Sequence, residues 1–338
     1  MVDFKIPDGP RILLEAELQP VQGDRFQPTG FADVGAGTFL LPNGRRKLLV
    51  ESVQSIANRM EAAVIGNDNR LKPEFEGLPY IQVKLAGDAD AETSSLVEAH
   101  RINSPFIISN ENFRQEFCEA AAYKKGQLLN WQKIAKALFY YDINSLLHGV
   151  FMANLEDGRV KVTRALSGYI EADNVREAVT GGVKNNPLDP SGTLRAENYD
   201  KDVYGNVPYQ RVEYTAEEIK AYFFIDLGLL RSYQLEKEAF ELLVCLSLYK
   251  IQHFLSEGLR LRTACSLTLK GGLVCTEPKA APIPTMKELK LLIQELIKTC
   301  RQKGLMGESP LELVTQTKTK KKEADTDKDV ATEPESQD

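Results

Sequence analysis

Residues 45–65 read RRKLLVESVQSIANRMEAAVI, and this stretch predicts a strand that leads directly into a helix. We expect the strand at Arg45–Val50 and the helix at Glu51–Ile65. On a helical wheel the apolar side chains collect on one side, and they are Val53, Ile56, Ala57, Met60 and Val64. The pattern therefore predicts an amphipathic helix with one buried side.

The opposite side of this helix has an unusual composition. It carries amides, hydroxyls and one guanidinium where solvent-exposed helices usually carry Glu and Lys, and the residues are Ser52, Gln54, Ser55, Asn58 and Arg59. Such groups are suited to hydrogen bonds with a sugar-phosphate chain. Two interpretations stay open from these residues alone: a nucleic-acid contact and an ordinary exposed helix surface.

Period-two alternation predicts strands on both sides of this βα step. Arg11–Leu18 alternates with one exception, and the turn Pro42-Asn43-Gly44 joins Thr38–Leu41 to Arg45–Val50 in a hairpin. The turn Asp157-Gly158 predicts a second hairpin. The remaining expected strands are the two arms of that hairpin, Leu147–Leu155 and Arg159–Ile170, together with Tyr209–Tyr214, Ala221–Leu229 and Leu259–Lys270.

Helical periodicity and composition predict three further helices, at Trp131–Leu147, Leu235–Ser256 and Met286–Lys303. Gly258 is placed to end the second of them. Thr215 and Glu218 have the spacing of a capping box. Strands and helices follow each other irregularly along the chain, which places the protein in the α+β class.

The strand predicted at Leu259–Lys270 has one apolar and one basic side. Its second side carries Arg260, Arg262 and Lys270 among small and hydroxyl residues. A strand face with an Arg-x-Arg pair can line a row of phosphates. A solvent-exposed sheet surface explains the same pattern, and both interpretations stay open.

We expect the body of the protein at residues 1–314, with insertions near 67–145 and 181–207. Prolines and glycines interrupt residues 67–127, which we interpret as mostly helical. Residues 181–207 are rich in Gly, Pro and Asn and include Lys184 and Arg195. Such a long irregular segment predicts either a mobile arm that orders on binding or a variable loop. Residues 315–338 hold five lysines and seven acidic residues with Val330 as the strongly apolar one, so we expect a disordered charged tail.

Composition excludes several classes of protein. The net charge of -6 argues against a surface that binds every polyanion. Five cysteines without a CxxC pair, and three histidines without HxH or HExxH spacing, predict neither a metal site nor a redox dithiol, and we expect no cofactor. Without an 18-residue apolar run or an apolar leader at the start, we expect a cytoplasmic protein with no membrane partner.

The glycine-rich stretch QGDRFQPTGFADVGAG at residues 22–37 does not fit a nucleotide-binding loop. A phosphate-binding loop of the Walker type requires Gly-Lys-Ser/Thr four residues after its first glycine, but Gly30 is followed there by Gly35-Ala36-Gly37. A dinucleotide fingerprint requires a third glycine where this chain has Leu40. We expect these glycines to let the chain bend close to a binding partner.

Several segments together resemble one family. They are PTGFADVGAGTF (28–39), LLVESVQSIANRME (48–61), LLHGVF (146–151), RALSGYIEADNV (164–175), VPYQRVEYTAE (207–217), YFFIDLGLLRSY (222–233) and GLRLRTACSL (258–267). Taken in this order, the chain from about Arg11 to Leu267 resembles the backbone subunit of the type I-G (formerly I-U) CRISPR interference complex, Cascade. This subunit belongs to the Cas-seven group of the RAMP superfamily.

The resemblance implies a core of the RNA-recognition, ferredoxin-like type (split βαββαβ) with inserted palm, fingers and thumb elements. It also implies a role in antiviral defence as a ribonucleoprotein subunit. Copies would stack head to tail along a CRISPR guide RNA as a helical filament. The implied partners are the guide RNA, target DNA, copies of this chain, a fused processing and capping subunit, a large subunit, and a helicase-nuclease recruited on target binding.

No short signature of the family marks each RNA contact, so the candidate residues come from the faces described above. We predict RNA contacts from Arg25, Arg45, Gln54, Asn58, Arg59, Arg164, Lys184, Arg195, Arg260 and Arg262. We expect no catalytic residue. The alternative is a backbone subunit with endoribonuclease activity on target RNA, for which Asp33 in the glycine-rich loop is the nearest candidate. A small-molecule enzyme is disfavoured because no GxSxG, Cys-His or DxD pattern is present.

Overall fold

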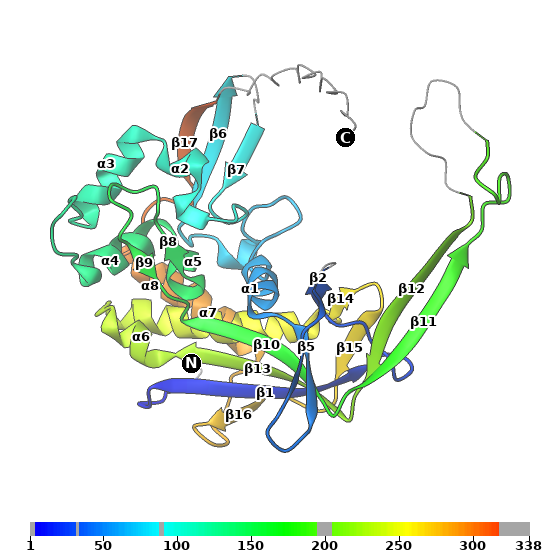
Figure 1. The fold of residues 1–338 in the computed structure, drawn as a ribbon. Coiled ribbons are helices and arrows are strands. Elements are labelled where there is room, and N and C mark those ends of the chain that lie inside the picture. Colours follow the sequence, from blue (N-terminus) through cyan, green and yellow to red (C-terminus); the bar gives the residue numbers. More distant parts are fainter. Residues whose placement is uncertain (1–3, 32–33, 88–90, 195–204, 318–338) are drawn as a thin grey trace, which may run out of the picture.

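The main element of the computed structural model, which describes residues 4–31, 34–87, 91–194 and 205–317, is an antiparallel sheet with helices on one face (Figure 1). Its strand order is β14 (Arg260–Arg262), β15 (Cys265–Leu269), β1 (Arg11–Pro20), β13 (Glu218–Asp226), β10 (Leu166–Asp173), β5 (Arg46–Glu51) and β4 (Thr38–Leu40), and β16 (Val274–Glu277) also pairs with β1. The expected mixture of helices with antiparallel strands is confirmed.

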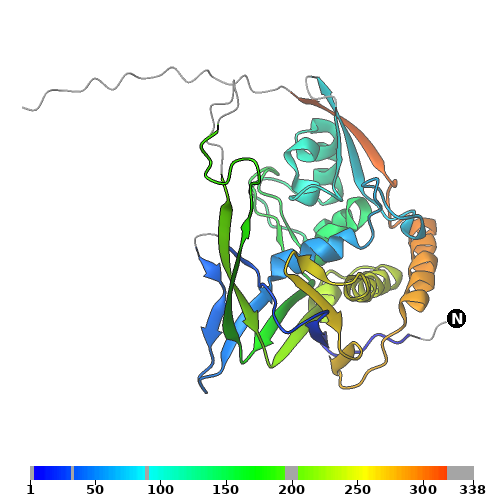
Figure 2. The same ribbon diagram turned by 90° about the vertical axis from the view of Figure 1, so that its right-hand side faces the viewer.

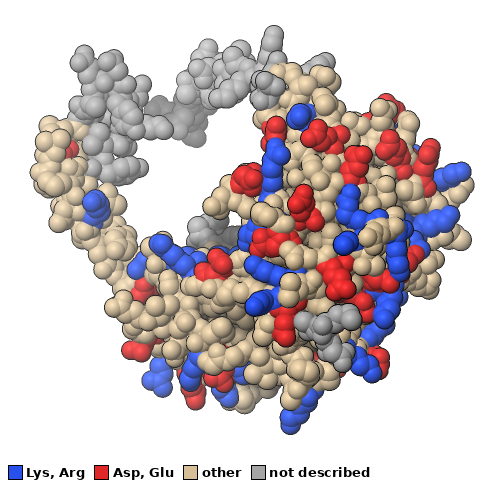
Figure 3. All heavy atoms as spheres, turned by 180° about the vertical axis from the view of Figure 1, so that it is seen from behind, with Lys and Arg blue, Asp and Glu red and all other residues tan. Residues whose placement is uncertain are grey.

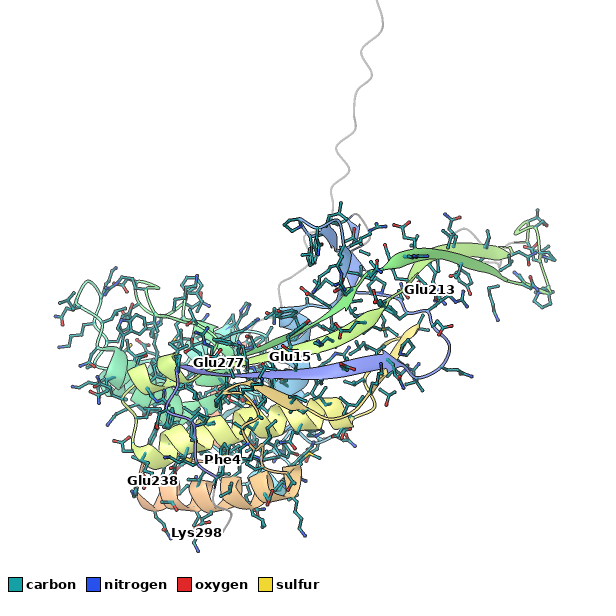
Figure 4. All side chains as sticks on the ribbon, turned by 90° about the horizontal axis from the view of Figure 1, so that it is seen from below. Phe4, Glu15, Glu213, Glu238, Glu277 and Lys298 are labelled. Atoms are coloured by element: carbon teal, nitrogen blue, oxygen red, sulfur yellow. The ribbon has the colours of Figure 1, made fainter. Side chains whose placement is uncertain are left out.

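Alternation along β1 decides which face of the sheet is buried. Ile12, Leu14, Ala16 and Leu18 are 0–4% exposed, as the period-two pattern predicts. They lie opposite β13, which in turn pairs with β10, and Ala221 of β13 and Ile170 of β10 are also fully buried. The helices α1 (Val53–Ala62), α6 (Leu227–Ser232), α7 (Lys237–Ser256) and α8 (Met286–Gln302) complete the core. Seen from below, the sheet, α7 and α8 follow one another as layers (Figure 4).

Three helices begin and end near the residues that the sequence predicts. The Ser52 side chain caps α1 by accepting a hydrogen bond from the Ser55 amide. Thr285 and Glu288 form a capping box at the start of α8. Gly258, two residues beyond the end of α7, has φ +76°, a conformation that glycine adopts without strain. Local chain chemistry is therefore enough to place these three helices.

Several predictions for strands and turns need correction. The strand predicted at Ala221–Leu229 ends at Asp226, whose side chain caps the helix α6 that begins at Leu227. The predicted strand Leu259–Lys270 is two strands, β14 and β15, which fold back on each other with Arg260 opposite Ser266. The Thr215-to-Glu218 segment is a short connection between two strands, so its capping-box spacing caps no helix. In the hairpin at Asp157-Gly158, only the two-residue strands β8 (Val150–Phe151) and β9 (Lys161–Val162) pair. β10 begins separately at Leu166.

Residues 73–148 mix strands with helices, so the expectation of a mostly helical 67–127 is wrong in part. The strands are β6 (Ile81–Gly87) and β7 (Ala91–Ser94). The helices are η1 (Pro73–Phe75), η2 (Arg101–Asn103), α2 (Pro105–Ile108), α3 (Glu111–Ala120), α4 (Trp131–Tyr141) and α5 (Ile143–His148). Because α5 ends at His148, most of the strand predicted at Leu147–Leu155 does not form.

A strand from the end of the chain completes the small sheet. β17 (Leu311–Thr317) pairs in parallel with β6, with Leu311 opposite Ile81 and Thr317 opposite Gly87. The predicted tail therefore begins too early, because Thr315, Gln316 and Thr317 belong to this strand. Its remainder, 318–338, lies outside the described residues.

An antiparallel pair, β11 (Arg176–Lys184) and β12 (Val207–Thr215), projects from the main body as an arm (Figures 1 and 2). Its ladder runs from Arg176 opposite Thr215 to Lys184 opposite Val207. The irregular segment predicted at 181–207 is thus wrong at its beginning, where residues 181–184 continue β11.

We predict that the two sides of residue 317 differ in their effect on stability. Deletion of 318–338 is expected to leave the melting temperature unchanged, because this segment is strongly polar. Deletion of 311–338 is expected to lower it by several degrees, because β6 then loses a seven-residue partner. Calorimetry on both truncations checks this, and equal melting temperatures would contradict the role given to β17.

Candidate nucleic-acid interface

The polar side of α1 faces outward, as predicted, but Val53, predicted on the buried side, is 38% exposed at the start of the helix. Ile56, Ala57 and Met60 are fully buried against the core, which leaves Gln54 and Asn58 exposed on the other side. The Gln54 amide nitrogen donates a 2.9 Å hydrogen bond to Asn58 Oδ1. The helix therefore presents a row of amides to its surroundings.

A groove with a volume of about 940 Å³ runs beside α1. Four of the predicted RNA-contacting residues line it: Gln54, Asn58, Arg59 and Arg260. Its other walls come from the loop after α1, from residues 96–101 and from the end of α7. The structure thus brings together residues from two predicted elements that are about 200 positions apart in the sequence.

Three arginines line the groove, Arg59, Arg101 and Arg260, and Arg101 is already paired with Glu61. The other two have unused hydrogen-bonding capacity. Arg59 donates from Nη2 to the Leu261 carbonyl at 2.8 Å, while its buried Nε has no partner among the described residues. The exposed Arg260 side chain forms no hydrogen bond or ion pair with the described part of the chain. The Arg260 guanidinium is therefore available to an anion. Arg59 is oriented by its contact with β14, and it can offer an anion only the part of its guanidinium that is not buried.

The groove also contains a cation that the sequence patterns did not indicate. Lys72 Nζ donates to the Ala63 carbonyl at 2.8 Å and lies 2.6 Å from His253 Nε2. His253 Nδ1 in turn lies 3.4 Å from a Glu257 carboxylate oxygen. Lys72 occupies a loop without periodicity, so only folding brings it to this wall. Glu61, Glu98 and Glu257 also line the groove, which keeps its charge mixed.

Two predicted contacts are directed into the protein instead. Arg164 donates to the His148 carbonyl at 3.2 Å and to the Gln54 side chain. Arg262 donates to the carbonyls of Gln27 and Val50, at 2.8 and 3.1 Å, and forms an ion pair with buried Glu51. The open basic strand face expected for Arg262 is therefore absent, because the chain turns back after β14.

The other predicted residues lie apart from the groove. Arg45 forms an ion pair with Asp173 at 2.6 Å, and Arg25 one with Glu213 at 3.6 Å. Lys184 lies on the arm, and Arg195 lies outside the described residues. Their contacts with RNA stay predictions.

The arm has one strongly apolar part. Val179 lies opposite Val212, and Val183 lies opposite Pro208, so these four side chains share one face of the ladder. Val179 is 72% exposed and Val183 is 55% exposed. Arg211, one residue before Val212, lies over the Tyr209 ring. In the space-filling view a hollow separates the arm from the body, and basic and acidic side chains are interspersed over the body (Figure 3).

A group of buried polar side chains connects α1 with α5 and α7. Arg101 pairs with Glu61 of α1, and Lys250 Nζ donates to Asn144 at 2.6 Å while lying 2.9 Å from His148 Nε2. Burial lowers the pKa of His148 well below its usual value and lowers the pKa of Lys250 to about 8. His148 is therefore neutral at pH 7 and accepts the hydrogen bond from Lys250.

The structure explains one glycine of the glycine-rich loop by local packing. Gly30–Phe31 (β2) and Gly35–Ala36 (β3) form a small hairpin, and a Cβ on Gly30 would lie 2.6 Å from the Gly35 carbonyl oxygen. Gly30 is therefore required by the hairpin itself. Asp33 lies outside the described residues, so the structure does not test its predicted alternative role.

Among the described residues, no group of three or more His, Cys, Asp or Glu side chains is arranged to hold a metal ion. Over the same part of the chain, no helix is long and apolar enough to cross a membrane.

Comparison with known proteins gives one family match. Residues 12–177 match a model of the family described as CRISPR-associated protein GSU0053 (Cas_GSU0053). A search of curated proteins found no match. The matched segment contains α1, the glycine-rich hairpin and residues 73–148, so it includes most of the groove.

Three solved structures are similar over most of this chain. A chain titled "CRISPR RNA-guided surveillance complex, pre-nicking" is 14% identical with a TM-score of 0.38, covering 77% of this chain and 74% of that one. A chain titled "CRISPR RNA-guided surveillance complex" is 13% identical with a TM-score of 0.36, covering 77% and 66%. Csc2 of Thermofilum pendens is 9% identical with a TM-score of 0.30, covering 87% and 76%.

The internal contacts of Arg262 predict a loss of stability on its removal. Arg262→Ala leaves the carboxylate of Glu51, which is 1% exposed, without its cation. We expect the free energy of unfolding to fall by about 3 kcal/mol or more. Arg260→Ala, two residues away on the exposed side, is the matched control and is expected to change stability by less than about 0.5 kcal/mol. Urea unfolding of both variants checks this, and equal midpoints would refute the internal role.

Proposed function

We propose that this chain is a CRISPR RNA-binding subunit of the Cas-seven type, and that it forms the backbone of a type I-G Cascade complex. The observation that carries the proposal is the groove beside α1, where Gln54, Asn58, Arg59 and Arg260 meet. The match of residues 12–177 to a CRISPR-associated family supports it independently.

The chemistry of the groove suits a single strand held by its backbone. Guanidiniums pair with phosphate oxygens, while the amides of Gln54 and Asn58 can donate to sugar and phosphate oxygens of any sequence. A guide RNA has a variable sequence, so its carrier must bind without reading bases. Mixed charge in the groove and a net charge of -6 favour a local track over a generally basic surface.

We further propose that the core is of the RNA-recognition, ferredoxin-like type. The strand order β15-β1-β13-β10, with all three pairings antiparallel, supports this arrangement. So does the chain order, in which α1 lies between β1 and β10, and α7 lies between β13 and β15. The arm and residues 73–148 would then be elaborations of this core.

Assembly along the guide is part of the same proposal. Copies would join head to tail, and the exposed face of the arm formed by Val179, Val212, Val183 and Pro208 offers an apolar surface that a neighbouring copy can cover. The expected further partners are a fused processing and capping subunit, a large subunit, target DNA and a helicase-nuclease. We propose that the complex acts in the cytoplasm.

Removing the two available arginines should weaken RNA binding by weakening phosphate contacts. For Arg59→Ala with Arg260→Ala, we expect lower affinity for guide RNA and a shallower salt dependence. On a single strand, the slope should change by about 0.7 for each lost phosphate contact. Fluorescence anisotropy at several salt concentrations measures both quantities.

The control for this double variant is Arg114→Ala, a partly exposed arginine of α3 that does not line the groove. It should leave affinity and slope unchanged. Unchanged RNA binding in the groove variant would remove the main support for the proposed function.

We propose that the subunit is not catalytic. Incubation of the assembled complex with labelled complementary RNA and a divalent metal ion is therefore expected to leave the RNA intact. Regularly spaced cuts that disappear in Asp33→Ala would instead establish the endoribonuclease alternative.

A further inference from the structure

Two arginines attach α1 to a single dipeptide beneath it, His148-Gly149. Arg164 donates to the His148 carbonyl and to Gln54 in the first turn of α1. Arg101 donates to the Gly149 carbonyl at 2.7 Å and to Glu61 in the last turn. The first and last turns of α1 are thus both connected, through these two arginines, to the dipeptide His148-Gly149.

We propose that Arg101 is a positioning residue that fixes α1 for nucleic-acid binding and couples it to the elements of residues 73–148. The expected effect on RNA binding rests on the proposed function. The positioning itself is a property of the free protein, so it can be tested without RNA.

Both the burial and the backbone conformation of Arg101 are unusual for an arginine. It is 8% exposed and has φ +51°, a region that non-glycine residues seldom occupy. A strained backbone persists where surrounding contacts determine it. Here the contacts are the two-pronged pair with Glu61, with Nε to Oε2 at 2.9 Å, and the Gly149 carbonyl.

The acceptor dipeptide is itself held rigidly. Gly149 has φ +79°, and a Cβ there would lie 2.8 Å from the Val162 carbonyl oxygen. On the preceding residue, the His148 ring accepts a hydrogen bond from Lys250 of α7. The carbonyls that receive Arg101 and Arg164 are therefore fixed relative to both α7 and the β8–β9 pair.

The charges of the cluster explain why an arginine is required. Glu61 has a side chain that is 12% exposed, and Arg101 is its ion-pair partner at the Oε1 and Oε2 oxygens. His148 Nδ1 lies 4.0 Å from Glu61 Oε1, too far for a hydrogen bond. A lysine at position 101 would keep the charge, but it lacks the planar fork that reaches Glu61 and Gly149 together.

The test compares Arg101→Lys and Glu61→Gln with Arg114→Lys, a change at a partly exposed arginine of α3. Hydrogen exchange of the free protein is measured at the amides of residues 53–62, together with guide-RNA affinity and its salt slope. For Arg101→Lys, which keeps the charge, we expect faster exchange in α1 and about tenfold weaker RNA binding, with an unchanged salt slope. For Glu61→Gln we expect faster exchange in α1, and exchange alone is compared for this variant because Glu61 also lines the groove and its charge acts on RNA directly. In the double variant Arg101→Lys with Glu61→Gln, exchange in α1 should be no faster than in either single variant. The control Arg114→Lys should exchange at the rate of the unmodified protein.

Unchanged exchange in α1 would overturn the inference, and so would a salt slope flattened in Arg101→Lys alone, which would indicate a direct phosphate contact. If Arg101→Lys fails to fold, Glu61→Gln tests the same pair from the α1 side. If the unmodified protein does not bind guide RNA, the proposed function fails, whereas the exchange data still decide whether Arg101 positions α1.

Discussion

The pairing of β1 with β13 is the constraint on which the rest of the structure depends. Eight residues of β1 pair with β13 in an unbroken register from Arg11 opposite Asp226 to Leu18 opposite Ile219. Because side chains alternate, a slip of one residue would move Leu14 and Ala16 to the exposed face. This register therefore decides on which face α1 and α7 pack, and it places the polar side of α1 beside β14.

The arginines discussed above are of two kinds: some neutralise a carboxylate inside the protein, and others line the groove without a carboxylate partner. Arg101 and Arg262 are paired with Glu61 and Glu51, because a buried carboxylate without a cation would be strongly destabilising. Arg59 and Arg260 have no carboxylate partner among the described residues and line an open groove, where a ligand can supply the anion. A negatively charged chain can in this way present a local phosphate track.

Much of the local structure could be predicted from the sequence. The strand Arg11–Pro20, the capped helix α1 and the long helix α7 depend on alternation, helical periodicity and turn chemistry, which act over a few residues. The small sheet was missed because β6 is stabilised by β17, more than 200 residues further along the chain. The break between β14 and β15 was missed because alternation continues through a tight turn.

The sequence by itself determined the class of the fold, the outward polar side of α1 and the family resemblance, since these depend on residue order and short-range periodicity. Only the tertiary structure decided which arginines are available for a ligand. That choice depends on which carbonyl or carboxylate lies within hydrogen-bond distance, as Glu51 does for Arg262, and chain positions far apart in the sequence supply these partners. Lys72 and Arg101 could not be predicted as members of the site, because their positions beside α1 also depend on contacts between residues far apart in the sequence.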